Sequence, residues 1–260
     1  MKSFRIDVKI IIATHKPYQF PKDELYIPVH AGKHNKENIG ITGDDTGDNI
    51  SVKNPNFCEL TALYWGWKNL QCEYLGLAHY RRHFIKSHGG SKADKMSKVL
   101  DSESINSILK EYDVILPKKK YYLVETNMEH YKNARYLKDL LKTREVIAEH
   151  YADYLPAFDV VMKRRYAHMC NMFVMRKELL NNYADWLFGI LFKLEKVIDI
   201  SNYSPLEARV FGFVSELLLD VWIVKNEVKY KEVPTMFLEK IQWHKKIYYF
   251  IRRRFRPKKK

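Results

Sequence analysis

The chain has 260 residues, of which 46% are hydrophobic and 14% aromatic, so it can bury a substantial core and does not have the aromatic-poor composition of disordered proteins. Its formal net charge of +14 predicts an anionic partner, either a nucleic acid or an anionic membrane surface. No apolar run is long enough to cross a bilayer and the N-terminus has no signal-peptide pattern, so we expect a cytoplasmic protein. Cys58, Cys72 and Cys170 lack zinc-ligand spacing and are interpreted as core thiols.

Strand-like and helix-like segments alternate along the chain. Strands are expected at 8–13, 26–29, 74–78, 113–117, 168–175 and 228–238. Helices are expected at 57–69, at 103–111, over most of 127–165, at 177–197, and from 204 to about 225. This order predicts an α/β fold with a mostly parallel central sheet flanked by helices, whose ligand cleft lies beyond the carboxyl ends of the strands. We predict one domain over residues 1–242 and a basic, aromatic tail over 243–260.

A basic cluster follows the buried strand at 74–78. It consists of His79, Tyr80, Arg81, Arg82 and His83. Two guanidinium groups beside an imidazole can neutralise a diphosphate through bidentate hydrogen bonds, and such a cluster can replace a metal. The alternative is a solvated basic turn, but its position directly after a buried strand favours a binding site.

Further candidates for binding a nucleotide or a sugar lie in loops. Thr14, His15 and His30 end the first two predicted strands, where a nucleotide would rest, although a structural histidine is an equal alternative. The polar loop at 43–51 offers Asp44, Asp45, Thr46, Asp48 and Asn49. Their oxygens can hold ribose or sugar hydroxyls, or a divalent cation, but an Asx-rich turn explains the pattern equally well.

Two further groups of residues are candidates for sugar binding and for catalysis. His168 and Asn171 can face an acceptor sugar or satisfy the core. Glu207 and Glu216 are candidates for a general base on the helix predicted from Ser204, and Asp199 is a weaker one. Glu207 also fits a capping box and Glu216 a solvent-exposed face. Arg209 shares one helical stripe with Gly212 and Glu216.

Several long segments together resemble one known family. They are IIATHKPYQFP, YIPVHAG, GDDTGDNISVKNPNFCELTALYWGWKN, YLGLAHYRRHF, HMCNMFVM and DISNYSPLEARVFGFVSELLLDVW. They resemble a bacterial family first catalogued as a domain of unknown function, found in gene sets for capsule, exopolysaccharide and O-antigen (lipopolysaccharide) synthesis and regarded as glycosyltransferases. The resemblance covers residues 8 to 240 approximately, with the motifs in order.

The resemblance implies a GT-A-like fold and hexosyl transfer from a UDP-sugar to a lipid-linked saccharide, with galactofuranose as one candidate sugar. GT-A enzymes ordinarily carry a metal-binding Asp-x-Asp motif where this chain has His79-Tyr80-Arg81-Arg82. We therefore expect no metal ligands and no cofactor, with Mg²⁺ or Mn²⁺ at Asp44 and Asp45 as the alternative. The resemblance also implies that Asn171 lies near the transferred sugar.

The basic tail predicts peripheral attachment to anionic lipid at the inner face of the cell membrane. A nucleic-acid-binding module is the main rival interpretation, but no nucleic-acid motif is present, so we expect no nucleic-acid partner. A non-catalytic scaffold of a polysaccharide-assembly complex is the other rival.

Overall fold

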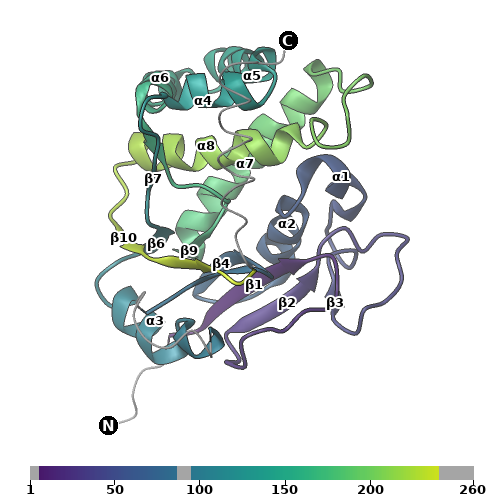
Figure 1. Cartoon of the computed structure of the whole chain (residues 1–260), viewed down its shortest axis with the longest axis vertical. Coiled ribbons are helices and arrows are strands. Elements are labelled where there is room, and N and C mark those ends of the chain that lie inside the picture. Colours follow the sequence, from purple (N-terminus) through teal and green to yellow (C-terminus); the bar gives the residue numbers. More distant parts are fainter. Residues whose placement is uncertain (1–5, 87–94, 240–260) are drawn as a thin grey trace.

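The computed structural model describes residues 6–86 and 95–239 of the chain. A mixed, largely parallel sheet crosses the molecule, with the strand order β10-β6-β9-β4-β1-β2-β3. Figure 1 shows α3 on one side of this sheet and α2 and α7 on the other, with α4, α5 and α6 in a further layer beyond α8. The predicted α/β architecture, with a central sheet between helices, is confirmed.

The bounds of the elements agree with most of the expected segments. The strands are β1 Val8–Thr14, β2 Tyr26–His30, β3 Thr42–Gly43, β4 Tyr74–His79, β5 Arg82–Phe84, β6 Val114–Pro117, β7 Lys120–Tyr121, β8 Tyr166–Ala167, β9 Phe173–Arg176, β10 Tyr230–Val233 and β11 Thr235–Phe237. The helices are α1 Asn54–Phe57, α2 Leu60–Asn69, α3 Ser102–Leu109, α4 Asn127–Ala134, α5 Leu137–His150, α6 Leu155–Lys163, α7 Lys177–Val197 and α8 Val210–Lys225.

The central strands are apolar on both faces because each face packs against its own core. Along β1, Ile11 and Ala13 join the larger core beneath α2, α7 and α8, whereas Ile10 and Ile12 join the smaller core beneath α3. A strand buried on both faces reads as a continuous hydrophobic run, which is why β1 and β4 are visible in the sequence. Parallel pairing of β1 with β2 and with β4 places the carboxyl ends of these strands at one edge.

The structure corrects the predicted segment at 168–175. Residues 168–172 are irregular, and the strand β9 starts only at Phe173. This strand runs antiparallel to both neighbours, β4 and β6, and so interrupts the expected parallel order. Cys170 and Asn171 have φ angles of 84° and 49°, which an extended strand does not contain.

Two predicted helices also differ from the structure. The helix at 57–69 is broken at Cys58, whose φ of 56° ends α1 before α2 begins. The helix predicted from Ser204 starts only at Val210, because residues 205–208 form a separate turn. The predicted last strand divides into β10 and β11, which pair with different strands, β6 and β5.

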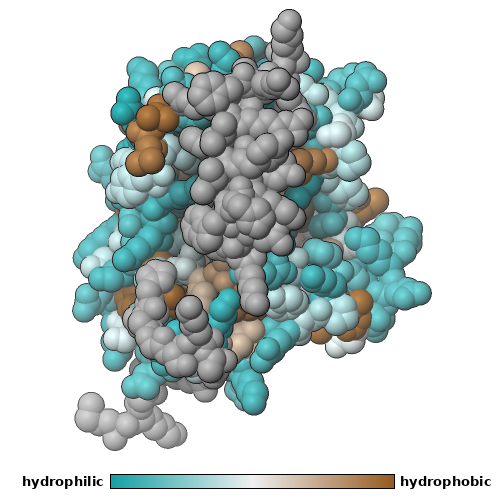
Figure 2. Space-filling view, viewed as in Figure 1, coloured by the Kyte–Doolittle hydropathy of each residue, from teal (hydrophilic) through white to brown (hydrophobic). Residues whose placement is uncertain are grey.

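The described residues on the face seen in Figure 2 are mainly hydrophilic. Hydrophobic residues appear on this face in small, separate patches. Among the helices in the described ranges, none has the length and apolar content needed to cross a bilayer. The predicted tail at 243–260, and the domain boundary at 242, lie outside the described residues.

Candidate functional site

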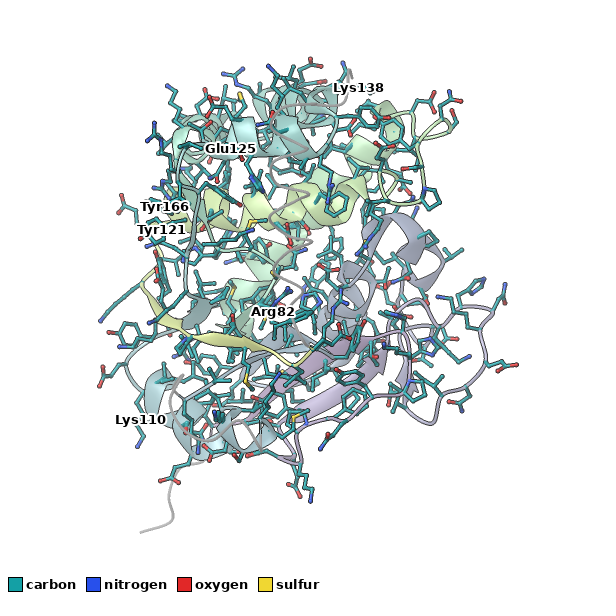
Figure 3. All side chains as sticks on the ribbon, in the orientation of Figure 1. Arg82, Lys110, Tyr121, Glu125, Lys138 and Tyr166 are labelled. Carbon is teal, nitrogen blue, oxygen red and sulfur yellow. The ribbon has the colours of Figure 1, made fainter. Side chains whose placement is uncertain are left out.

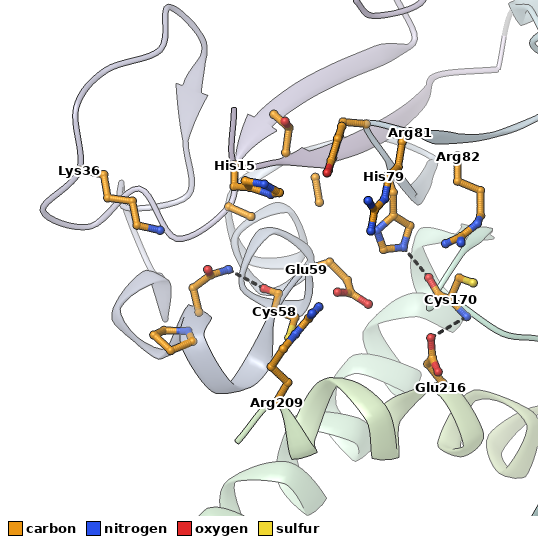
Figure 4. Close-up of a pocket in the computed structure, with 16 residues that line it drawn as sticks. His15, Lys36, Cys58, Glu59, His79, Arg81, Arg82, Cys170, Arg209 and Glu216 are labelled. Atoms are coloured by element: carbon orange, nitrogen blue, oxygen red, sulfur yellow. Dashed lines mark hydrogen bonds between the residues drawn. The ribbon is translucent and has the colours of Figure 1, made fainter. Parts of the chain in front are cut away.

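A cavity of about 460 Å³ opens at the edge of the sheet where β1, β2 and β4 end (Figure 4). Its far walls come from the α1–α2 junction, from the loop before β9 and from α8. The lining residues are Ala13, Thr14, His15, Ala31, Lys36, Asn54, Pro55, Cys58, Glu59, His79, Tyr80, Arg81, Arg82, Cys170, Arg209 and Glu216. Ligands bind at this edge in open α/β sheets because the strand ends leave a crevice there.

Most of the predicted basic cluster lies on this wall. His79 ends β4 and pairs with Arg82 of β5, so Tyr80 and Arg81 form the tight turn between the two strands. The Arg81 guanidinium also forms a 3.3 Å ion pair with Glu239. Both guanidinium groups lie over the ring of Phe237 at 5.4 Å from its centroid, which supports their side chains from outside. The cavity wall therefore carries two positioned guanidinium groups.

His79 is fixed by the loop that precedes β9. Its Nε2 lies 2.6 Å from the carbonyl oxygen of Cys170. Because a carbonyl oxygen only accepts, Nε2 carries the proton in this arrangement. Burial is the main cause that lowers the pKa of His79, so the ring is neutral at neutral pH.

Glu59 is the main site residue that the sequence did not reveal. It follows Asn56 with the spacing of a helix start signal, yet its side chain makes no capping bond. The break at Cys58 directs the Glu59 carboxylate into the cavity (Figure 4). Asn171 holds it there by donating a 2.7 Å hydrogen bond from Nδ2 to Glu59 Oε1.

The backbone around Glu59 is strained. Cys58, Cys170 and Asn171 all have positive φ angles without being glycine. Such conformations are unfavourable by roughly 1–3 kcal/mol each and gather at functional sites. The two cysteines are half-buried on the cavity wall, and burial raises the pKa of Cys58 to about 11. Cys170 also packs against the smaller core, so it belongs both to the core and to the cavity wall.

Glu216 enters the cavity from α8, opposite the strand ends. Its Oε1 accepts a 3.0 Å hydrogen bond from the backbone N–H of Cys170. Burial, and then the negative charge of Glu59, raise the pKa of Glu216 to about 7. A carboxyl group with a pKa near the working pH suits proton transfer, because both protonation states are populated.

The loop before β9 is clamped to α8 at several points. Asp220 Oδ2 accepts from the His168 backbone N–H at 2.9 Å, and Asp220 Oδ1 lies 2.5 Å from His168 Nδ1. Ser215 donates a 3.0 Å bond to Asn171 Oδ1. These bonds fix the loop that holds both Glu59 and His79. His168 and Asn171 are buried and do not line the cavity. Asn171 is hydrogen-bonded to Glu59, which does line it.

Glu207 does not line this cavity. It is buried at 7% exposure in the turn before α8, where Ser204 donates a 2.8 Å bond and Tyr136 a 3.3 Å bond to its carboxylate. The Ser204 backbone N–H donates to the Glu207 carboxylate, and the Glu207 backbone N–H donates to Ser204 Oγ. These reciprocal hydrogen bonds are the expected capping pattern, here within a single turn. Arg209 does line the cavity and donates a 2.9 Å hydrogen bond to Cys58 Sγ. The structure thus separates the two candidate bases.

Gly212 lets α8 approach the α1–α2 junction. A Cβ atom there would lie 3.1 Å from Cys58 Sγ and 3.3 Å from Cys58 Cβ. This close approach brings Arg209, Gly212 and Glu216 of the predicted stripe to the same side of α8 as Cys58 and Glu59.

The predicted donor-side residues divide into two sets. Thr14, His15 and Tyr80 line the cavity, and the rings of His15 and Tyr80 meet edge to face at 5.2 Å. The His30 side chain is buried and lies outside the lining. Lys36, from the loop after β2, adds a cation that the sequence did not single out.

The polar loop at 43–51 lies apart from the cavity lining. The Asp44 carboxylate is buried and accepts bonds from the backbone N–H groups of Gly32 and Lys33 and from Ser51 Oγ. Thr46 accepts a 2.9 Å bond from Trp65 Nε1. Asp45, Asp48 and Asn49 also lie outside the lining. The loop is thus built as an Asx-rich turn, and its donor-binding function stays a prediction.

These carboxylates do not fit a metal ion. Both carboxylate oxygens of Asp44 already accept hydrogen bonds from the loop backbone, and one also accepts from Ser51. The Asp45 carboxylate lies 4.0 Å from the Lys33 ammonium. Over the described ranges, no group of three or more His, Cys, Asp and Glu side chains is arranged to hold a cation. The expectation that no metal takes part stays a prediction.

Comparisons with known proteins place the chain in a family. The solved structure of the WbbM bifunctional glycosyltransferase, in its apo form, is similar with 35% identity and a TM-score of 0.83. The match covers 90% of this chain and 46% of that one, so this chain spans less than half the length of that protein. Comparison with curated protein sequences finds no significant match. The family model described as a domain of unknown function, DUF4422, matches residues 9–227, and the chain therefore belongs to this family.

Proposed function

We propose that the protein is a glycosyltransferase that moves a hexose from a UDP-sugar onto a saccharide acceptor. The observation that carries this proposal is the arrangement in one cavity of a cationic wall at the strand ends and two carboxylates opposite it. The similarity to a structure named as a glycosyltransferase supports the same class of reaction. A purely binding function explains the cationic wall but requires no carboxylate with a pKa of about 7 facing it.

The donor binds with its diphosphate against the basic cluster. Arg81 and Arg82 are positioned to donate bidentate hydrogen bonds, and Lys36 and Arg209 add charge from the opposite walls. Charge-assisted bonds of this kind stabilise a departing diphosphate without a divalent cation. The uridine lies over the ends of β1 and β2, where Thr14, His15 and Tyr80 provide polar and aromatic contacts.

Glu216 is the base that we assign to the transfer step. Its carboxylate takes the proton from an acceptor hydroxyl, and the acceptor oxygen bonds to the anomeric carbon of the donor. The bond from that carbon to the diphosphate oxygen breaks, and the electron pair leaves with the nucleoside diphosphate. Glu59 keeps Glu216 basic enough for this step, because its negative charge helps to raise the pKa.

The biological setting follows from the sequence resemblance. We propose a lipid-linked acceptor in capsule, exopolysaccharide or O-antigen synthesis, with galactofuranose among the candidate sugars. The basic tail at 243–260 attaches the protein peripherally to anionic lipid on the inner face of the membrane. Sedimentation with vesicles that contain phosphatidylglycerol tests this attachment, and equal sedimentation of the chain truncated after Gln242 would contradict it.

A screen of nucleotide sugars tests the function. The protein is incubated with UDP-glucose, UDP-galactose or UDP-galactofuranose and a panel of octyl glycosides, with and without chelator. We expect UDP release and a product one hexose heavier by mass spectrometry, with no loss when chelator is present. A nucleic-acid-binding module or a scaffold would give neither product nor UDP, and Glu216→Gln supplies the matched inactive control.

A further inference from the structure

A second, smaller cavity of about 70 Å³ lies on the other side of Glu216, which lines both cavities. Its other walls come from α4, from α8 and from the segment that leads into α4. On this measure one water molecule needs about 10–15 Å³, so the cavity has room for one edge of a sugar ring but not for an oligosaccharide. Glu216 thus stands between a large cationic cavity and a small one of different character.

Two buried polar atoms on the wall of the small cavity lack partners. Asn127 is 2% exposed and Tyr131 5% exposed, and both line the cavity. Within residues 6–86 and 95–239, neither Asn127 Oδ1 nor Tyr131 Oη has a hydrogen-bond partner. Buried polar atoms are nearly always paired with protein, water or ligand, so an acceptor and a hydroxyl on one cavity wall can both be completed by a molecule that enters the cavity.

The orientation of Asn127 is fixed by its neighbours. Its Nδ2 donates to the carbonyl oxygens of Val161 at 2.8 Å and Tyr166 at 3.0 Å. These two bonds fix which amide atom is the nitrogen, and they leave Oδ1 as a free acceptor among the described residues. Tyr131 Oη can donate, and burial raises its pKa far above the usual range, so it keeps its proton. Asn127 and Tyr131 lie about one turn apart on α4, so hydroxyls on one edge of a sugar ring, which donate and accept, can pair with both atoms.

The remaining walls are typical of a saccharide site. Tyr122 stacks on His130 with 4.0 Å between ring centroids, and the Arg135 guanidinium lies 3.6 Å above the Phe213 ring. Aromatic rings beside a few positioned polar groups are the usual composition of small-molecule sites. His130 is held in turn by Glu125 at 2.8 Å. Figure 3 places Glu125 in the helical layer, apart from Arg82 at the strand ends.

We infer that the small cavity is the acceptor subsite, in which Asn127 and Tyr131 bind hydroxyls on the edge of the acceptor sugar. With this edge of the sugar bound, the reacting hydroxyl lies against Glu216. The donor diphosphate lies in the larger cavity, against Arg81 and Arg82. The inference rests on the proposed function and adds to it the acceptor class, a sugar ring that presents adjacent hydroxyls.

Tyr131→Phe is the sharpest test, because it removes the orphaned hydroxyl and breaks no hydrogen bond to a described residue. Tyr74→Phe is the matched control, because Tyr74 Oη in β4 is equally buried and unpartnered over the same ranges but lies outside both cavities. Ala134→Phe adds a ring to the cavity wall and should block it. Binding of the octyl glycoside panel is measured by saturation-transfer NMR with UDP present.

We expect at least one glycoside to bind the wild-type protein and the Tyr74→Phe variant equally. Tyr131→Phe should raise its Kd by about tenfold, the effect of one lost hydrogen bond, and Ala134→Phe should abolish the signal. UDP affinity should match wild type in all three variants. If UDP binds but no glycoside does, or if Tyr131→Phe and Ala134→Phe bind glycoside normally, the cavity holds only water and the inference is wrong. Failure of UDP to bind would instead overturn the proposed function.

Discussion

Glu59 and Glu216 face the same cavity, and after burial the negative charge of Glu59 is the largest contribution that raises the pKa of Glu216 to about 7. The two carboxylates are held from one loop, because Asn171 donates to Glu59 while the Cys170 N–H donates to Glu216. The negative charge of one carboxylate disfavours ionisation of its neighbour, which gives Glu216 a pKa suited to accepting a proton. This coupling should be measurable both in the stability of the protein and in the pH dependence of its activity.

Glu216→Gln should stabilise the protein at alkaline pH. The folded pKa of Glu216, about 7, lies above its ordinary value of 4.5, so ionisation in the folded state is unfavourable. The free energy of unfolding of the wild type should therefore fall between about pH 4.5 and 7 and stay low above that. At pH 8 the variant should be more stable by about 3 kcal/mol, and at pH 4 the difference should vanish. Urea unfolding at both pH values checks this, and equal stability at pH 8 would contradict it.

Glu59→Gln should shift the pH dependence of transfer. Without the neighbouring charge the pKa of Glu216 falls, so the rising acid limb of kcat should move below pH 7. Activity at pH 8 depends on how well the substituted amide keeps the hydrogen bond to Asn171. The kcat of each protein is measured from pH 5 to 9. An acid limb that stays at the wild-type position would show that the two carboxylates do not interact.

Glu207→Ala should affect folding rather than chemistry. Glu207 lies outside the cavity lining and accepts hydrogen bonds from Ser204 and Tyr136 in a closed turn. Its loss removes these hydrogen bonds from a buried turn and should lower the free energy of unfolding by about 1–3 kcal/mol. Thermal unfolding measures this, with Glu195→Ala as control, because Glu195 forms a surface ion pair with Lys53. A stable but inactive Glu207→Ala protein would assign the base to Glu207 instead.

Asn171→Ala should act on catalysis through Glu59. The side-chain amide of Asn171 forms hydrogen bonds with Glu59, Gly212 and Ser215. Loss of this amide therefore frees the Glu59 carboxylate. We expect kcat to fall while the KM for the donor stays close to wild type, and the pH profile to shift in the direction of Glu59→Gln. A parallel rise in donor KM, or a pH profile identical to wild type, would show a purely structural function.

The sequence predicted the parts of the fold that depend on local patterns. The apolar runs of β1 and β4 and the amphipathic period of α7 are such patterns, and the predicted bounds of α7 agree with Lys177–Val197. The direction of β9 was not predictable, because antiparallel pairing with β4 depends on which strands meet in space. The late start of α8 is also tertiary in origin, since Asn56 Nδ2 donates to the Ala208 carbonyl oxygen at 2.9 Å, just before the helix.

The strand-end half of the candidate site could be predicted from the sequence, whereas the carboxylate Glu59 could not. His79, Arg81 and Arg82 follow a buried strand, and strand ends point to the ligand edge. Glu59 was hidden, because its spacing from Asn56 is that of a helix start. Only the packing of Gly212 against Cys58, with the positive φ at Cys58, reveals that its carboxylate faces the cavity.

Calorimetric titration of UDP tests the central claim that Arg81 and Arg82 bind the diphosphate of an activated sugar. We expect saturable binding by the wild type and at least tenfold weaker binding by Arg81→Ala and by Arg82→Ala, since each loses a charge-assisted hydrogen bond of about 1.5–3 kcal/mol. Arg176→Ala is the control, because Arg176 pairs with Asp113 outside the cavity lining. Undiminished UDP binding by the double variant Arg81→Ala/Arg82→Ala, or no binding by the wild type, would contradict the account.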